Sequence, residues 1–341
     1  MTLATHITSA AENLPLPDSL LRLGISRMVG RSNSRLASAQ AATSGFAADM
    51  ESYRIAEHTE AANRQHYELP PGFFGLVLGP RRKYSCCLYP TGRESLEEAE
   101  LHALEETIAH AGLADGQEIL ELGCGWGSLS LFMARRFPNA RIMAVSNAVA
   151  QRGFIEAQAQ RLGLQNLQVI TADMNEFDPA RQFDRVVSVE MFEHMANWRG
   201  LLTKLRGWLR PGGKLFVHVF AHATQPYRFD HEDEADWIAR YFFTGGIMPS
   251  HDLIAAFPDL FTLTRDWRWS GTHYQRTAQD WLRNYDREAS AIRTMMEDVY
   301  GAGAKLWFRR WRLFFLATAG LFGHAGGEAW GVSHYLLTPV P

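Results

Sequence analysis

Residues 118–128 read EILELGCGWGS, a short apolar run that enters three glycines spaced as G-x-G-x-G. Residues 129–137 then have the apolar spacing of a helix. A turn off a strand needs glycine where a ligand must approach the backbone without meeting a Cβ atom. The amides at the start of the next helix can hold an anionic group. The stretch therefore predicts a strand–turn–helix unit that binds a nucleotide-like ligand through Gly123, Gly125 and Gly127.

The acid inside this stretch, Glu121, lies just ahead of the turn. Its presence favours a nucleoside that carries a positive sulfonium or amino-acid end over a dinucleotide with a pyrophosphate.

From residue 117 onward, strand-like and helix-like segments alternate, a pattern typical of a parallel sheet. Right-handed crossovers place the carboxyl ends of such strands, and with them the ligand crevice, at one edge. Before them, Ser95 and Glu98 form a capping box for a helix that ends near Gly112. The predicted strands are 118–122, 141–146, 167–172, 184–189 and 214–220, and the predicted helices are 128–137, 149–162 and 197–209.

The flanking segments have a different character. Residues 1–66 predict helices whose basic face is solvated, which we favour, or lies on a membrane surface. Residues 223–328 are rich in aromatic side chains and predict a helical cap, with one long amphipathic helix at 279–300. The run KLWFRRWRLFF within 303–321 is interpreted as a packed helix whose arginines reach solvent, in preference to a membrane or nucleic-acid patch. Residues 329–337 predict a closing strand.

The composition is 46% hydrophobic and 12% aromatic over 341 residues, which is enough to bury a large core. A formal net charge of -3 gives no electrostatic case for nucleic acid as a partner. The three cysteines cannot form a disulfide framework and favour a reducing compartment. The sequence shows neither a signal-peptide pattern nor an uninterrupted apolar run of spanning length. We therefore expect a soluble cytoplasmic protein.

Polar residues follow the second and third predicted strands. Ser146 and Asn147 end the second strand, and Gln151 lies early in the next helix, where many nucleotide folds place an acid for the ribose. We expect Ser146 and Gln151 to take that role. At the end of the third strand, Asp173 can accept a hydrogen bond from an adenine amine while Met174 packs on the ring. A simple turn residue is the alternative interpretation of Asp173.

The fourth predicted strand ends in Glu190, Met191, Phe192, Glu193 and His194. A carboxylate beside an imidazole can fix its tautomer and raise its basicity, which gives a general base near neutral pH. Helix N-cap acids that face solvent are the alternative. The three ionisable residues at the ligand edge are the strongest catalytic signal in the chain.

Taken in order, these motifs resemble the cyclopropane-fatty-acid-synthase superfamily of S-adenosylmethionine-dependent methyltransferases, in particular the branch of plant coclaurine N-methyltransferases. The resemblance extends from about Leu14 to Tyr335. It is carried by HYELPPGFF, KYSCCLY, LELGCGWGS, SNAVAQ, DRVVSVEMFEHM, RYFFTGGIMPS, GTHYQRT and GEAWGVSHYLL. It implies an α/β class I methyltransferase fold, a Rossmann-like and mostly parallel sheet with one antiparallel closing strand.

The resemblance also implies three parts. Residues 1–94 form an N-terminal helical segment and a loop that covers the cofactor. Residues 95–222 and 329–341 form the core, and residues 223–328 form the substrate-covering cap with the C-terminal helices. The cofactor residues implied are Tyr84, Ser85, Glu121, Gly123, Gly125, Gly127, Ser146, Asn147, Gln151, Asp173, Met174 and Glu190, with no metal.

Two reactions compete within this superfamily. In an amine N-methyltransferase, the resemblance gives Glu193 and His194 as the base that accepts a proton and Glu190 as the seat of a cationic amine. In a cyclopropane synthase, an alkene takes the methyl group and bound bicarbonate removes a proton. Residues similar to the bicarbonate cradle are Cys86 (through its backbone), Glu193, His218 and Tyr274.

Glu190 discriminates between the two reactions, because cyclopropane synthases usually carry glycine at this position and the amine enzymes carry glutamate. Cys86 favours the lipid reaction, since the plant amine enzymes tend to have serine at this position and the lipid enzymes have cysteine. The implied substrate pocket contains Cys86, Tyr241, Phe242, Phe243 and Trp267, although any one of these aromatics is compatible with a simple core role.

We therefore predict transfer of a methyl group from S-adenosylmethionine, with S-adenosylhomocysteine as product, to a hydrophobic amine of benzylisoquinoline type. Methylation of an unsaturated acyl lipid with bicarbonate as base is the alternative, and only that alternative implies peripheral membrane contact. A catalytically silent binding module is disfavoured by the intact Glu190, Glu193 and His194. A homodimer is compatible with the sequence.

Overall fold

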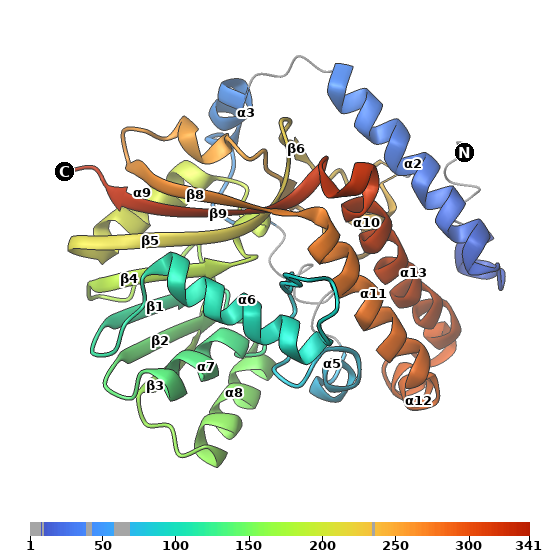
Figure 1. The fold of residues 1–341 in the computed structure, drawn as a ribbon, viewed down its shortest axis with the longest axis horizontal. Helices are drawn as coiled ribbons and strands as arrows, with labels where there is room; N and C mark the ends of the chain where they lie inside the picture. Colours follow the sequence, from blue (N-terminus) through green and yellow to red (C-terminus); the bar gives the residue numbers. More distant parts are fainter. Residues whose placement is uncertain (1–7, 9, 39–42, 58–68, 234–235) are drawn as a thin grey trace.

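The computed structural model describes residues 8, 10–38, 43–57, 69–233 and 236–341. Its centre is a seven-stranded sheet in the order β3-β2-β1-β4-β5-β9-β8, in which β9 alone runs antiparallel to its neighbours (Figure 1). The sheet confirms the predicted class I fold. The strands are β1 (Glu118–Leu122), β2 (Arg141–Ser146), β3 (Leu167–Thr171), β4 (Phe183–Val189), β5 (Leu209–His222), β8 (Phe261–Ser270) and β9 (Trp330–Pro339).

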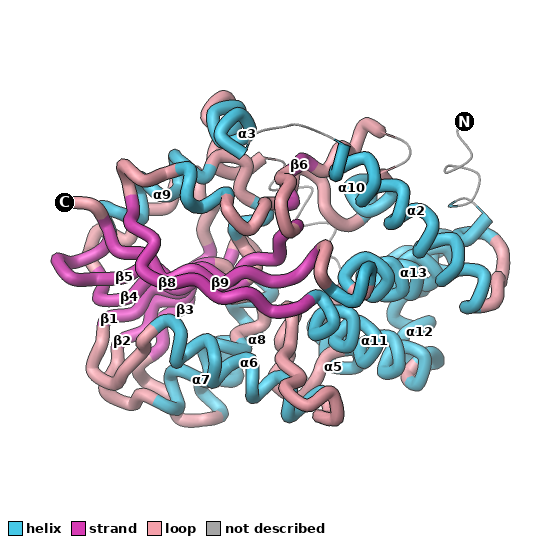
Figure 2. Tube along the Cα trace, turned by 45° about the horizontal axis from the view of Figure 1, so that its top comes forward, coloured by secondary structure: helices cyan, strands magenta, loops and turns pink. Residues whose placement is uncertain are grey.

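Helices cover both faces of the sheet (Figure 2). On one face lie α6 (Leu96–Ala111), α7 (Ser128–Arg136) and α8 (Val149–Arg161). On the other lie α9 (Trp198–Trp208) and α3 (Thr43–Met50). The predicted capping box of α6 is present, because the Ser95 side chain accepts from the Glu98 amide and the Glu98 carboxylate accepts from the Ser95 amide. On both faces of the sheet, apolar side chains are buried between the strands and the covering helices.

A helical layer stands beside the sheet and packs around an aromatic-rich core of its own (Figure 1). It contains α2 (Asp18–Ser38), α5 (Pro71–Val77), α10 (Trp237–Tyr241), α11 (Gly271–Arg287), α12 (Ala289–Tyr300) and α13 (Ala304–Phe322). A two-stranded ribbon of β6 (Tyr227–Arg228) and β7 (Ile247–Met248) lies near it, and the short helices are η1 (Phe192–His194), η2 (Leu253–Ala256), η3 (Gly301–Gly303) and η4 (His324–Gly327).

Two predictions about the cap are wrong. The expected long helix at 279–300 is two helices, α11 and α12, separated at Glu288, and α11 begins earlier, at Gly271. Residues 261–270 form β8 and belong to the main sheet. As an edge strand, β8 is mostly exposed and charged, so it lacks the apolar alternation that identifies a half-buried strand.

The arginine-rich run forms α13, whose apolar side chains are buried, as the interpretation as a packed helix predicts. Arg310 is ion-paired with Glu12, and Arg312 with both Asp18 and Asp286, whereas Arg309 donates to the backbone carbonyls of Glu12 and Asn13. The Arg310 side chain is only 11% exposed, so the prediction that it reaches solvent is wrong. Among the described helices, none combines the length and apolar character that crossing a bilayer requires. Parts of the predicted N-terminal segment, including residues 58–68 with the start of the HYELPPGFF motif, lie outside the described residues.

Candidate active site

Two cavities meet at the carboxyl ends of the parallel strands. The first has a volume of about 130 Å³ and the second about 110 Å³. Five residues line both: Gly123, Gly125, Gln151, Glu190 and His194. These residues come from the turn after β1, from α8 and from the segment after β4, so the sheet edge predicted to hold the ligand does bring them together.

The glycine turn is shaped as its sequence requires. Gly123 has φ 76°, and a Cβ there would stand 2.6 Å from the Met191 side chain. Gly125 has φ 52°, and a Cβ there would project into open space with no protein atom within 4 Å. Because Gly125 lines both cavities, that space is where a ligand can reach the backbone. The turn is therefore a cradle and not only a tight connection.

The second cavity has the polar lining expected around a nucleoside. Ser146, Asn147, Gln151, Asp173 and Met174 all line it. The Ser146 hydroxyl donates to Gln151 Oε1 at 2.5 Å and accepts from the backbone N–H of Ala148 at 3.1 Å. Asp173 Oδ1 accepts from the backbone and side chain of Asn175, so it closes a turn as well as lining the cavity.

Several buried polar atoms around the first cavity have no hydrogen-bond partner among the described residues. They are Gln151 Nε2, Ser128 Oγ, Trp126 Nε1 and Trp281 Nε1. Leaving such groups unsatisfied costs about 1–3 kcal/mol each, so native structures rarely keep them without a partner. Their position indicates a polar ligand that fills both cavities, and an S-adenosylmethionine molecule fits this donor set.

Tyr84, Ser85 and Glu121, three of the residues predicted to bind the cofactor, line the first cavity. The Glu121 carboxyl accepts from the Ser130 hydroxyl at 2.5 Å. Burial raises the pKa of Glu121 to about 8, with the Ser130 hydrogen bond acting in the opposite direction. Burial therefore favours the neutral form of the Glu121 carboxyl at neutral pH.

Glu190 is the most connected group of the site. Its Oε1 accepts from the backbone N–H of Cys86 at 2.9 Å and lies 3.2 Å from His218 Nε2. Its Oε2 accepts from the Tyr274 hydroxyl at 2.6 Å. Burial raises the pKa of this carboxyl, although the nearby Lys83 charge and the bonds from Cys86 and Tyr274 lower it. A carboxyl group with three such partners has a fixed position in the site.

The backbone of Glu190 is strained. Its φ is 49°, a left-handed conformation that costs a residue with a Cβ about 1–2 kcal/mol. Glycine would adopt this conformation without that cost. The strain is consistent with a functional requirement for the side chain at position 190.

The predicted pair of Glu193 and His194 occupies two different environments. His194 lines both cavities and its ring stacks on Phe243, with centroids 4.4 Å apart. Glu193 is fully buried, and its Oε1 accepts from the Phe220 amide at 2.8 Å. Burial, and next the Glu190 charge, raise the pKa of Glu193 well above its usual value. Burial thus favours the neutral form of the Glu193 carboxyl, and Glu193, unlike His194, lines neither cavity.

The loop at 83–89 is tied to α11 by the GTHYQRT motif. Thr277 Oγ1 accepts from the Cys87 amide at 3.0 Å, and His273 Nδ1 accepts from the Tyr89 amide at 3.2 Å. Tyr274 in the same helix turn reaches Glu190. One helix therefore positions both the Glu190 carboxyl and the loop whose residues Lys83, Tyr84 and Ser85 line the first cavity.

Lys83 is a site residue that the sequence analysis missed. It is buried, lines the first cavity, and donates to Ser85 Oγ at 2.5 Å and to the Cys86 carbonyl at 2.7 Å. Its place directly before the predicted Tyr84 and Ser85 was the available signal. Its charge lowers the pKa of Glu190.

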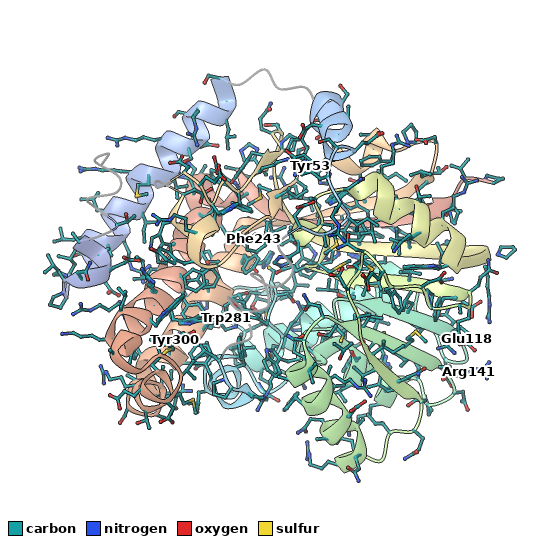
Figure 3. All side chains as sticks on the ribbon, turned by 180° about the vertical axis from the view of Figure 1, so that it is seen from behind. Tyr53, Glu118, Arg141, Phe243, Trp281 and Tyr300 are labelled. Carbon is teal, nitrogen blue, oxygen red and sulfur yellow. The ribbon has the colours of Figure 1, made fainter. Side chains whose placement is uncertain are left out.

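The predicted pocket aromatics separate into lining and supporting residues. Phe243 lines the first cavity, and Figure 3 shows it with Trp281 between the sheet and the helical layer, far from Glu118 and Arg141. Phe242 stacks on Phe314, a lining residue, at 4.4 Å.

The remaining predicted pocket residues lie elsewhere. The Arg310 guanidinium lies over the Tyr241 ring in a cation–π contact, 3.7 Å from the ring centroid. Cys86 contributes its amide to Glu190. The prediction for Trp267 is corrected, because this residue lies on β8 and stacks on His110 with centroids 3.8 Å apart. The cause is the missed strand, which carries Trp267 to the face covered by α6.

Comparison with known proteins agrees with this geometry. The family profile described as Mycolic acid cyclopropane synthetase matches residues 55–325. The (S)-coclaurine N-methyltransferase of Thalictrum flavum subsp. glaucum is 36% identical over 83% of this chain and 80% of its own length. The cyclopropane-fatty-acyl-phospholipid synthase of Escherichia coli (strain K12) is 28% identical over 65% of this chain and 56% of its own.

Comparison with solved structures indicates the same family and fold. A coclaurine N-methyltransferase bound to N-methylheliamine and SAH superposes with a TM-score of 0.94 at 30% identity, over 99% of this chain and 100% of that one. A cyclopropane synthase from Mycobacterium tuberculosis shares the fold, with a TM-score of 0.69 at 22% identity over 83% of this chain and 99% of that one. The chain therefore belongs to the mycolic acid cyclopropane synthetase family and is an S-adenosylmethionine-dependent methyltransferase.

Proposed function

We propose that this enzyme transfers the methyl group to the nitrogen of a hydrophobic amine, of the benzylisoquinoline type. The names of its relatives support the acceptor class, since several of them are N-methyltransferases of plant alkaloids. When bound, S-adenosylmethionine supplies an electrophilic methyl group. The chain's own residues must then seat an amine, free its lone pair and exclude water.

The observation that carries the proposal is the position of the Glu190 carboxylate. It accepts from the Cys86 amide, contacts His218 and accepts from Tyr274, three of the four groups that the resemblance assigns to a bicarbonate cradle. A carboxylate and a bicarbonate present the same planar pair of oxygens. Because Glu190 already fills that cradle, this site carries its own carboxyl group, which in its ionised form pairs with an ammonium group and leaves no place for bicarbonate.

The remaining roles follow from the cavity lining. Glu190 holds the cationic amine, and His194, which faces both cavities, takes the proton that an ammonium must lose before its nitrogen can attack. We assign Glu193 a positioning role, since its carboxyl is buried against the Phe220 amide. Phe243, Trp281 and Phe314 form an aromatic wall that favours a flat, cationic ring system.

We also place the enzyme in the cytoplasm. The three cysteines are free thiols, all buried, which suits a reducing compartment.

A mass-shift screen tests the proposal. The enzyme is incubated with S-adenosylmethionine and either a panel of primary, secondary and tertiary isoquinoline amines or liposomes of unsaturated phospholipid. We expect amines, but no lipid, to gain the mass of one methylene, and Glu190→Gln to lose the reaction while the exposed control His102→Gln keeps it. Lipid products with unmodified amines would overturn the proposal.

A further inference from the structure

A continuous row of side chains runs from Glu190, just after the end of β4, along the α6-covered face of the sheet. Glu190 Oε1 lies 3.2 Å from His218 Nε2, and His218 Nδ1 lies 2.8 Å from His334 Nε2. His334 Nδ1 lies 2.8 Å from His110 Nδ1, and His110 Nε2 lies 3.1 Å from Glu106 Oε1. Every contact is within hydrogen-bond distance. We call this row, Glu190–His218–His334–His110–Glu106, the histidine row.

The fold explains why these residues meet. His218 on β5 and His334 on β9 are direct partners in the antiparallel ladder, so their side chains lie on the same face of the sheet. Helix α6 covers that face and supplies His110 and Glu106, one helical turn apart. Trp267, the direct partner of His334 on β8, stacks on His110 and holds its ring in place.

The two ends of the row differ in access to water. His218 and His334 are completely buried, whereas the Glu106 side chain is 42% exposed. Neither inner histidine is accessible to solvent, and the Glu190 side chain, which lines both cavities, is 9% exposed. The row therefore joins Glu190 at the cavities to an exposed carboxylate on α6.

Proton counting restricts the row to two arrangements. A neutral imidazole has one N–H, so it donates from one nitrogen and accepts at the other. If Glu190 carries a proton, it donates to His218, each histidine donates outward, and neutral His110 donates to the Glu106 carboxylate. If Glu190 is ionised, each histidine donates its N–H toward Glu190. His110 must then be an imidazolium, because it donates from Nδ1 to His334 and from Nε2 to the Glu106 carboxylate. Both arrangements contain the same number of protons.

We propose that the histidine row relays one proton between Glu190 and His110, so that Glu190 becomes an anion when a cation enters the cavity and is neutral when none is present. The inference rests on the proposed role of Glu190 in facing cationic ligands. In the forward shift, the Glu190 proton moves to His218 Nε2, the His218 Nδ1 proton to His334 Nε2, and the His334 Nδ1 proton to His110 Nδ1. The reverse shift restores every tautomer when the cation leaves.

Burial and neighbouring charges act differently on the three histidines of the row. Burial lowers the pKa of both His218 and His334 well below the usual value, so neither holds the charge itself. The charges facing these two rings are Glu190 and Lys83, and those facing His110 are Glu106 and Arg265. Burial lowers the pKa of His110, Glu106 raises it and Arg265 lowers it, and the net direction is downward, so the imidazolium form of His110 needs the Glu106 carboxylate beside it. Glu106 is therefore the counter-ion on which the forward shift depends.

Nitrogen-15 NMR of histidine-labelled enzyme tests the relay directly. S-adenosylmethionine carries a sulfonium charge that S-adenosylhomocysteine lacks, and both are used at neutral pH without any acceptor. We expect His110 to give imidazolium signals with the first ligand and neutral signals with the second, with His110→Gln assigning the resonances and His102 as an internal control on the same helix. Identical His110 signals with both ligands would overturn the relay.

The pH dependence of kcat/KM separates a relay from simple packing. In His110→Gln and Glu106→Gln, Glu190 must lose its proton to water, so the acidic limb should move up by about one pH unit and activity should recover at high pH. The neighbouring His102→Gln and Glu105→Gln serve as matched controls without a shift. A loss that is equal at every pH would mean a structural role only.

The two experiments also separate this inference from the proposed function. If no amine is methylated in the mass screen but the His110 signal changes, the proposed amine acceptor is overturned and the proton relay stands. If amines are methylated but the His110 signals and the acidic limb do not change, the relay is overturned and the amine acceptor stands.

Discussion

The Tyr274 hydroxyl donates a 2.6 Å hydrogen bond to Oε2 of Glu190 and so joins the first turns of α11 to the end of β4. The Tyr274 ring also stacks on Phe322, with centroids 4.3 Å apart. A phenylalanine at this position keeps the stacking and removes only the donor.

Tyr274→Phe is therefore expected to weaken the anionic form of Glu190. A hydrogen bond to a charged group contributes about 1.5–3 kcal/mol, so kcat/KM for the amine should fall roughly tenfold or more at neutral pH. Loss of the donor also raises the pKa of Glu190, which moves the acidic limb of the pH profile upward. Steady-state kinetics across pH, with circular dichroism to confirm folding, measure both effects; an unchanged profile would remove Tyr274 from the site chemistry.

Glu190→Gly should relieve the backbone strain and empty the anion cradle. Thermal unfolding is expected to show no net gain in stability, because the relief of about 1–2 kcal/mol of backbone strain is offset by the Cys86 amide and the Tyr274 hydroxyl, which lose their acceptor. Amine turnover should be lost and should return in part when acetate or bicarbonate is added, since either anion can be held by Cys86, His218 and Tyr274. Addition of chloride at the same ionic strength is the control, and rescue by chloride would contradict the explanation.

Glu121 should release a proton when the cofactor binds. Because its pKa is raised to about 8, the carboxyl is mostly protonated at neutral pH, and a cationic amino group favours the ionised form. Calorimetry in buffers of different ionisation enthalpy should detect more protons released by the native enzyme than by Glu121→Gln at the same neutral pH. The difference should shrink as the pH rises above 8, and a constant difference would argue against titration of Glu121.

Two neighbouring substitutions should have opposite outcomes. His194→Gln is expected to remove most turnover while cofactor affinity stays close to native, since His194 acts on the acceptor. Glu193→Gln should stay within roughly twofold of native kcat, because an amide imitates the neutral acid that burial favours and still accepts from Phe220. Turnover assays paired with calorimetric binding of S-adenosylhomocysteine decide; a severe loss in Glu193→Gln would mean that Glu193 acts as a carboxylate.

The sequence predicted those parts of the site that depend on short-range pattern. The glycine turn, the α6 capping box and the polar residues at the ends of β2 and β3 each combine residue type with position on one element, and all lie where expected. Glu190 could be singled out because its position after β4 placed it at the ligand edge.

The remaining features depend on contacts between distant elements. The break at Glu288 lies within a continuous apolar pattern, and β8 is too exposed to be recognised from alternation, so Trp267 was assigned to the wrong side of the molecule. The histidine row joins α6, β5 and β9, whose register the sequence does not state. The place of Lys83 in the site depends on the hydrogen bonds of its ammonium group to Ser85 and to the Cys86 carbonyl, which residue type alone does not predict.

The left-handed backbone at position 190 has a consequence for how this family can diverge. The main chain there already has the shape that glycine prefers, so an exchange between glycine and glutamate needs no rearrangement of β4 or of the helix that follows. Under the proposed function, Glu190 supplies the anion of the site from the chain itself. Glycine at this position would leave the Cys86 amide, His218 and Tyr274 to bind an anion from solution, with the glycine turn after β1 unaltered.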